Sequence, residues 1–269
     1  MLRVLEVFAI LVAIAAAVRV LEPRLAFFPM PGETVTPRDF GIEYEATAIA
    51  TADGERLRVW KLLHRAPRAQ IVYFHGNGGN LSIWAPILAG IARQGFSVVA
   101  VDYRGYGLST GRPSERGLYR DIEAVVEHAA TATNRKIPLV YWGRSLGVVM
   151  AAYAATIRAP DGLVVESGFA DARSVLRGSL VMSALGVFSS YRFPCAEFLD
   201  RVKRPVLVMH GDRDSVIAIG LGRALFERIS SPKTFVTIRG GDHNDAVPPD
   251  PDTYWQAVHH FVSELGSRL

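Results

Sequence analysis

The sequence predicts an α/β protein built on a mostly parallel sheet of about eight strands, with helices on both faces. From residue 40 onward, short runs rich in β-branched and aromatic residues alternate with longer segments of helical spacing. Each of the later short runs reaches a glycine where the strand is expected to end. The 269 residues, 49% hydrophobic and 21% charged, are enough for one large domain.

The strands are expected in two groups. "EYEATAIATADGERLRVWKLL", residues 43–63, predicts a hairpin around the turn "ADGE". Crossover helices separate the remaining runs, so these are expected to pair in parallel. They are QIVYFHG (70–76), FSVVAVDYRG (96–105), LVYWG (139–143), GLVVESG (162–168), VLVMHGD (206–212) and TFVTIRGG (234–241). Helical spacing appears over residues 83–93, 115–131, 146–158, 219–229 and 253–265.

An uncharged apolar run, "VFAILVAIAAAV" at residues 7–18, lies near the N-terminus. It fits a signal peptide, with Ala15 and Ala17 as a small-residue cleavage pattern. It also fits a retained membrane anchor, because apolar sequence continues through "VRVLEPRLAFFP" with arginines able to reach the interface. A core helix is the third and least favoured interpretation. We favour an anchor in residues 1–24 and one α/β domain over 25–269; arginines on both sides leave the orientation open.

One connection is too long and too apolar for a simple loop. It joins the runs ending at Gly168 and beginning at Val206, and it contains "SLVMSALGVFSSYRF". A small lid over residues 172–200 suits this position, because long insertions at the functional edge of a sheet are often lids. A core helix is the alternative.

"GRSLG", residues 143–147, matches the pattern GxSxG between an expected strand ending at Trp142 and an expected helix. This is the context of a nucleophile elbow, in which a serine occupies a strained strand-to-helix turn. Glycines flank the serine because larger side chains would clash with the neighbouring strand and helix. The pattern therefore predicts that Ser145 is a reactive hydroxyl.

A serine nucleophile needs a base and an acid that orients the base. "HGDRDSV" and "RGGDHNDAV" follow two later strands and supply Asp214 and His243. Because parallel strands end at one edge of the sheet, the three side chains are expected to meet there. Asp212 is the alternative acid, and Asp242 and Asp245 are competitors for the histidine ring. His75 and His210, each in an "HG" strand end, are expected to bond loop carbonyls instead.

Acyl transfer also needs donors aimed at the developing oxyanion. The backbone N–H of Leu146, directly after the serine, is one candidate. The second is the N–H of Asn77 in "HGNGGN", where glycines allow close approach of the backbone. A phosphate-binding loop is the rival interpretation, but neither GK[ST] nor a GxGxxG that opens a helix is present.

The composition argues against several other classes. A net charge of +4 and an isoelectric point near 9.3 come from basic residues scattered among acidic ones, so no nucleic-acid partner is expected. Cys195 is the single cysteine, and no Cys/His cluster has zinc-ligand spacing. Neither a metal nor an organic cofactor is expected.

Together, "YFHGNGGN", "VDYRGYGLSTGRPSERGLYRD", "YWGRSLG", "VLVMHGDRDSV" and "GGDHND" resemble the α/β-hydrolase superfamily, specifically its bud-emergence subgroup, relatives of the mammalian depalmitoylating α/β-hydrolase-domain proteins. The resemblance runs from about Leu25 to the C-terminus. It implies a serine hydrolase of esters or thioesters, often classed with serine aminopeptidase-like hydrolases. Ser145 would be the nucleophile, His243 the base and Asp214 the acid.

Two features depart from the family pattern. Val148 stands where members often have a third glycine, and the cysteine-rich N-terminus of some depalmitoylases is absent. Arg104 of "DYRGYG" is expected to brace its loop through an ion pair, because the chemistry needs no cation.

The function expected is therefore hydrolysis of a small or lipid-like acyl substrate, with membrane contact through the N-terminal segment. A peptidase is an alternative, but it would need an acidic patch for an α-amino group, and residues 173–195 contain no carboxylate. A membrane-anchored scaffold without activity is the other alternative, and the intact serine, acid and histidine argue against it.

Overall fold

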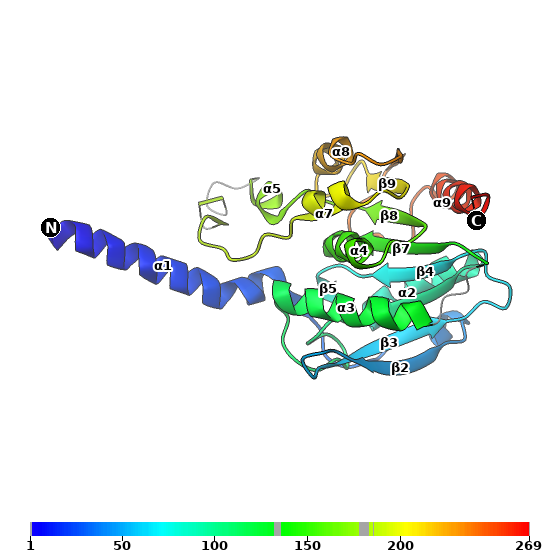
Figure 1. Cartoon of the computed structure of the whole chain (residues 1–269), viewed down its shortest axis with the longest axis horizontal. Coiled ribbons are helices and arrows are strands. Elements are labelled where there is room, and N and C mark those ends of the chain that lie inside the picture. Colours follow the sequence, from blue (N-terminus) through cyan, green and yellow to red (C-terminus); the bar gives the residue numbers. More distant parts are fainter. Residues whose placement is uncertain (1, 132–135, 178–182, 185, 269) are drawn as a thin grey trace.

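The structure is a computed structural model that describes residues 2–131, 136–177, 183–184 and 186–268. Within them, an 8-stranded sheet has the order β10-β9-β8-β7-β4-β6-β3-β2 (Figure 1). The strands are β2 (Glu45–Ala50), β3 (Arg56–Leu62), β4 (Gln70–Phe74), β6 (Ser97–Val101), β7 (Leu139–Arg144), β8 (Gly162–Glu166), β9 (Val206–Gly211) and β10 (Lys233–Ile238). All pairs from β10 to β6 are parallel, so the predicted sheet is confirmed.

The predicted hairpin forms one edge of this sheet. β2 pairs antiparallel with β3, and β3 pairs antiparallel with β6. Ile49 lies opposite Leu57 and both are buried, which fixes the register because a one-residue slip would expose both. The turn between the strands includes Gly54 at φ 91°, a conformation that glycine adopts without strain.

Helices cover both faces because successive strand side chains point to opposite sides. In β4, Val72 and Phe74 join one core, whereas Ile71 and Tyr73 join the other. The first core contains residues of α3 (Glu115–Thr131), α4 (Leu146–Ile157), α7 (Cys195–Arg201) and α8 (Ile219–Glu227). The second contains residues of α2 (Leu81–Arg93) and α9 (Pro251–Gly266). The predicted helices are all present, with ends displaced by at most about two residues.

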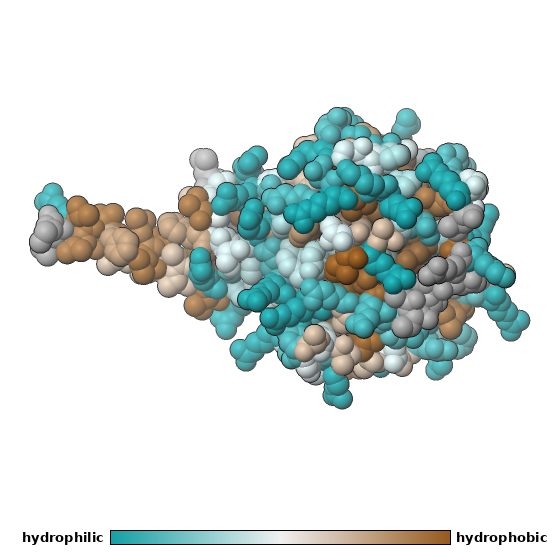
Figure 2. Space-filling view, in the orientation of Figure 1, coloured by the Kyte–Doolittle hydropathy of each residue, from teal (hydrophilic) through white to brown (hydrophobic). Residues whose placement is uncertain are grey.

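The N-terminal segment is a single helix, α1 (Leu2–Ala26), that projects from the domain (Figure 1). An 18-residue window within Arg3–Ala26 has a mean hydropathy of 2.5, and 0% of that window is buried. The space-filling view shows an apolar stalk beside a mostly polar body (Figure 2). The length and hydropathy suffice to cross a bilayer, and the exposure argues against a core helix. The expected division between residues 24 and 25 falls inside this helix.

The connection between β8 and β9 contains α5 (Ala172–Leu176) and α7. Of the residues predicted to form a lid, 178–182 and 185 lie outside the described residues. The rings of Tyr191 and Phe193 pack edge-on against Phe27, with centroids 5.5 Å and 6.1 Å away. This part of the connection therefore contacts the chain that follows α1, and its role as a lid stays a prediction.

The chain after α1 also contacts the centre of the fold. β1 (Phe28–Pro29) pairs in parallel with β5 (Gly78–Gly79), within the "HGNGGN" segment. A short 3-10 helix, η1 (Pro37–Phe40), then leads to the sheet. The base of α1 is thus held at the edge of the sheet where the strands β4 and β7 end.

Arg104 braces three segments, as its expected ion pair implied. Its side chain is 7% exposed and donates to Asp53 in the hairpin turn at 2.9 and 3.0 Å. Its Nε and backbone N–H both donate to Asp121 of α3, each at 2.8 Å. Burial raises the pKa of Asp121 to about 6, although the bonds from Arg104 oppose that shift. The cluster joins the hairpin, the loop after β6 and α3.

We expect Arg104→Met to lower the free energy of unfolding by about 3–5 kcal/mol, because Asp121 would be buried without its cation. Urea unfolding measures the change. Arg120→Met is the matched control: Arg120 is 40% exposed and meets Asp53 at 2.7 Å, so its loss should cost less than about 1 kcal/mol. Equal losses in the two variants would contradict the bracing role.

The loss in Arg104→Met should also depend on pH. The folded pKa of Asp121 lies above its ordinary value of 3.8, so its ionisation lowers stability as the pH rises through about 6. Without Arg104, ionisation is still less favourable, whereas the protonated acid is little affected. The difference between variant and wild type should therefore be larger at pH 8 than at pH 5.

Candidate active site

Ser145 lies at the sharp turn between β7 and α4. Its backbone has φ 56° and ψ −122°, a conformation that costs a non-glycine residue on the order of 1–3 kcal/mol. The strand continues to Arg144, beyond its predicted end at Trp142, because Gly143 still pairs with Phe74 and Arg144 with Glu166. The Ser145 N–H donates to the Glu166 carbonyl at 2.9 Å, so the strained residue is held by β8.

The flanking glycines permit backbone contacts that no side chain would allow. A Cβ atom on Gly147 would lie 1.9 Å from the carbonyl oxygen of Phe74, at the end of β4. A Cβ atom on Gly143 would lie 2.2 Å from the carbonyl oxygen of Gly147. The sequence-based reason for these glycines is confirmed.

Val148, at the position where relatives often have glycine, is fully buried. The space for it comes from Gly168, after β8, where an added Cβ atom would lie 3.1 Å from Val148 Cγ1. The departure from the family pattern is therefore accommodated by a second small residue.

The structure brings Ser145, His243 and Asp214 together in one hydrogen-bonded series. His243 Nε2 lies 3.0 Å from Ser145 Oγ, and His243 Nδ1 lies 2.8 Å from Asp214 Oδ2. Ser145 follows β7, Asp214 follows β9 and His243 follows β10. The side chain of His243 is 10% exposed, whereas that of Asp214 is fully buried. Three residues far apart in sequence thus meet at the carboxyl edge of the sheet, as predicted.

Asp214 is held as a carboxylate by its surroundings. Burial alone would raise its pKa, but bonds from His210 and His243 and from the Ile217 N–H together bring the pKa below its ordinary value. The backbone N–H groups of Val216 and Ile217 donate to Oδ1 at 3.0 and 2.7 Å. This leaves Oδ2 to face the two histidine rings. A permanently charged acid beside Nδ1 favours the His243 tautomer with its free nitrogen toward Ser145.

The competing residues have other partners. Each of the three other aspartates accepts a hydrogen bond from a backbone N–H: Asp212 from Gly240, Asp242 from Ser215 and Asp245 from Asp242. The His75 ring lies 2.7 Å from the Gly76 carbonyl oxygen. The His210 ring lies 2.8 Å from the Ile217 carbonyl oxygen. Both histidines bond loop carbonyls, as expected. His210 also reaches Asp214 at 3.4 Å, which sequence reasoning missed.

Asn77 and Leu146, the two expected oxyanion donors, line the same cavity as Ser145. The Asn77 segment is held from two sides. The backbone carbonyl of Asn77 accepts from the Phe28 N–H at 2.9 Å and from the Tyr106 hydroxyl at 2.8 Å. The side-chain amide of Asn77 donates to the Ala26 carbonyl at 3.1 Å. The loop is thereby fixed close to Ser145 by the chain that leaves α1.

Arg144, the residue before Ser145 in "GRSLG", has a role that sequence reasoning missed. Its guanidinium, 6% exposed, donates to the backbone carbonyls of His243 and Asp245 at 2.7 and 2.8 Å. Glu166 lies 3.7 Å from its Nε. Glu166 in turn accepts from Trp142 Nε1 at 2.9 Å and from the Tyr254 hydroxyl at 3.1 Å. Arg144 therefore holds the loop that carries His243.

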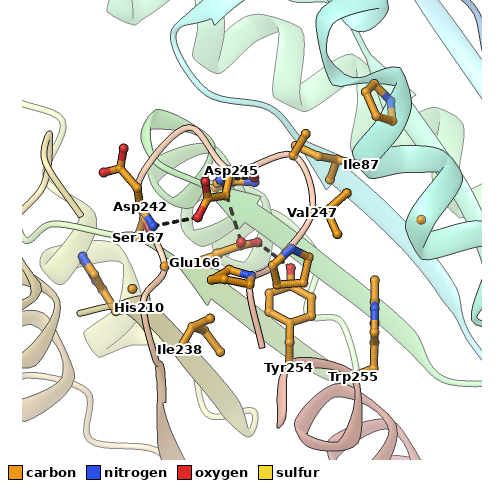
Figure 3. A pocket seen from close by; sticks show the side chains of 18 of the residues that line it. Ile87, Glu166, Ser167, His210, Ile238, Asp242, Asp245, Val247, Tyr254 and Trp255 are labelled. Carbon is orange, nitrogen blue, oxygen red and sulfur yellow. Dashed lines mark hydrogen bonds and ion pairs between the residues drawn. The ribbon is translucent and has the colours of Figure 1, made fainter. Parts of the chain in front are cut away.

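Two cavities flank this arrangement. One, of about 230 Å³, lies beside Glu166, Tyr254 and Trp255, with Asp242 and Asp245 above it (Figure 3). Neither Ser145 nor His243 is among its lining residues. The other, of about 520 Å³, contains Ser145, Asn77 and Leu146 and is lined mainly by apolar side chains. The second cavity is therefore the one that reaches Ser145.

Comparison with known proteins identifies the family and the relatives of this chain. Residues 65–198 match the family described as serine aminopeptidase, S33. An uncharacterized protein of Mycobacterium tuberculosis is 30% identical over 97% of this chain and 96% of its own length. An uncharacterized membrane protein of Saccharomyces cerevisiae is 31% identical over 86% and 84%. Protein bem46 of Schizosaccharomyces pombe is 29% identical over 85% and 80%.

Solved structures share the fold. The esterase Pf2001 of Pyrococcus furiosus superposes with a TM-score of 0.68 at 18% identity, covering 87% of this chain and 99% of that one. Est1E from Butyrivibrio proteoclasticus gives 0.64 at 19% identity, covering 82% and 98%. The family match, the relatives and the fold lead to one conclusion: the chain belongs to the α/β hydrolases, in the bud-emergence-type subgroup of the serine aminopeptidase-like enzymes.

Proposed function

We propose that the chain is a serine hydrolase that cleaves ester or thioester bonds of acyl substrates. The observation that supports this most directly is the series from Ser145 Oγ to His243 Nε2, 3.0 Å, and from His243 Nδ1 to Asp214 Oδ2, 2.8 Å. Both distances are those of hydrogen bonds along which a proton can be transferred or held.

In the first half of the reaction, Ser145 Oγ attacks the carbonyl carbon while His243 Nε2 accepts the hydroxyl proton. Asp214 keeps Nδ1 protonated and stabilises the imidazolium that forms. The negative charge on the carbonyl oxygen is received by the N–H groups of Leu146 and Asn77. Collapse of this intermediate breaks the bond to the alcohol or thiol, which leaves with the proton from His243. The acyl group remains on Ser145 as an ester.

In the second half, His243 takes a proton from water as the water oxygen attacks the acyl carbon. The new intermediate collapses and releases the carboxylic acid, and the proton returns from His243 to Ser145 Oγ. The net reaction consumes one water and needs only the side chains and N–H groups named here.

The lining of the 520 Å³ cavity favours an acyl substrate over a peptide. Recognition of a free α-amino group needs a carboxylate that is available to it. Glu22 of α1 is the one carboxylate among the described lining residues, and three of its acceptor positions are already taken by Ser189 and Ser190. A scaffold without activity would have no use for a strained serine with an oriented base.

A retained single-pass anchor in α1 is the second part of the proposal. Its hydropathy, its exposure and a yeast relative named as a membrane protein support association with a membrane. The 18-residue apolar window of α1 is close to the roughly 20 residues that cross the hydrocarbon core.

We expect a fluorophosphonate probe to label the purified full-length chain, and Ser145→Ala to abolish the labelling because it removes the nucleophile. His243→Ala should lower both labelling and hydrolysis of p-nitrophenyl acetate by about 10⁴-fold or more. His260→Ala is the control, since that ring is 76% exposed on α9. Labelling that survives in Ser145→Ala, or none in folded wild type, would refute the proposed nucleophile.

Arg144 is expected to act by positioning His243. Arg144→Met should lower kcat for p-nitrophenyl acetate by about 10–100-fold, because a displacement of about 1 Å in a reacting group has that effect. KM should change much less, since Arg144 is absent from the lining of the Ser145 cavity. Arg144→Lys should recover part of kcat by donating to one of the two carbonyls. An effect on KM alone, or an unchanged kcat, would contradict this role.

A further inference from the structure

One wall of the cavity at Ser145 is built by the helix that is expected to enter the membrane. Ile14, Ala17, Val18, Leu21 and Leu25 of α1 all line the cavity. Their spacing of three and four residues places them on one face of the helix. Ile14, Leu21 and Leu25 nevertheless remain 37%, 46% and 60% exposed. The cavity therefore opens to the outside along α1.

The position of this wall is fixed by polar contacts at the base of the helix. Glu22 is 8% exposed, although it is charged and most other residues of α1 are exposed. Its carboxylate accepts from Ser189 Oγ at 2.7 Å and from the Ser190 N–H at 2.8 Å, and also from Ser190 Oγ. Ser189 and Ser190 belong to the connection between β8 and β9. Ser189 and Tyr191 of this connection line the part of the cavity that faces α1.

A second attachment joins the helix to the expected oxyanion loop. The amide of Asn77 donates to the Ala26 carbonyl, and β1 pairs with β5 directly after the helix ends. Phe27, 2% exposed, anchors the junction against two aromatic rings. The contacts of Glu22 and those of the chain after α1 together fix the direction of α1 relative to Ser145.

The apolar run of residues 7–18 and the cavity wall overlap. Ile14, Ala17 and Val18 belong to both, so in a membrane-anchored chain the same turns of helix face the hydrocarbon and the cavity. A polar substrate entering there would have to leave water, whereas an acyl chain would pass from one apolar environment to another. The volume of about 520 Å³ is that of a ligand-sized pocket.

We propose that α1 is a substrate-binding element: its face from Ile14 to Leu25 forms one wall of a groove through which the acyl chain of a membrane ester passes directly from the bilayer to Ser145. This inference rests on the proposed hydrolase function. It adds that the helix selects for long acyl chains, a role separate from anchoring.

The first test narrows the groove by one substitution. Ala17→Trp should lower the ratio of kcat/KM for p-nitrophenyl palmitate to that for p-nitrophenyl acetate by about tenfold or more, measured with full-length protein in phosphatidylcholine vesicles. Ala16→Trp is the matched control: at 100° per residue Ala16 lies on the opposite, exposed side of the same helix, and the ratio should not change. Equal ratios in Ala17→Trp, Ala16→Trp and wild type would overturn the groove.

The second test uses the wild-type chain, so it does not depend on a variant that folds. The full-length protein in vesicles is labelled at Ser145 with a hexadecyl fluorophosphonate that carries a diazirine at the chain end. The labelled protein is then illuminated and digested with trypsin. We expect crosslinks in the peptide of residues 4–19, which contains Ile14, Ala17 and Val18. Attachment to Ser145 with crosslinks only outside α1 would overturn the groove alone. Failure of the probe to attach to Ser145 would overturn the hydrolase function, and the groove with it.

Discussion

The approach of two backbones at Gly147 and Phe74 is the constraint on which the rest of the site depends. Because no Cβ atom stands between them, α4 begins directly against the end of β4 and Ser145 is raised at a sharp turn. The same approach brings the Asn77 segment, which follows β4, close to the serine. One contact between main chains thus places the expected nucleophile and both expected oxyanion donors together. The strain at Ser145 is tolerated because α4 is almost entirely buried and β7 is paired on both sides.

Arginines in this protein stabilise loops at the edge of the sheet. Arg104 binds two carboxylates from the hairpin turn and α3, and Arg144 binds two carbonyls of the loop that carries His243. A guanidinium suits this task because its five donors lie in a fixed plane and stay charged at any physiological pH. The loops after β6 and β10 therefore have defined positions without forming part of the sheet.

The helix α1 connects a membrane-type segment to the centre of the site. Glu22 ties its base to Ser189 and Ser190, and β1 then pairs with the segment that contains Asn77. A flexible tether would leave the domain free to turn relative to its anchor. These contacts instead give the cavity one orientation relative to α1, which is what a substrate drawn from a bilayer would require.

By itself the sequence determined the fold class, the hairpin, the parallel strands and the meeting of Ser145, Asp214 and His243. These depend on local periodicity and on the rule that parallel strands end at one edge, so spacing along the chain is sufficient. Only the tertiary structure decided the roles of Arg144 and Glu22. Their partners are 99 and 167 residues away, and no local pattern encodes such pairs. Residues 173–195 contain no carboxylate in the sequence. In the folded chain Glu22 of α1 nevertheless contacts this segment, at Ser189 and Ser190. No local pattern predicts this contact, because the docking of a helix depends on the shape of the whole surface that receives it.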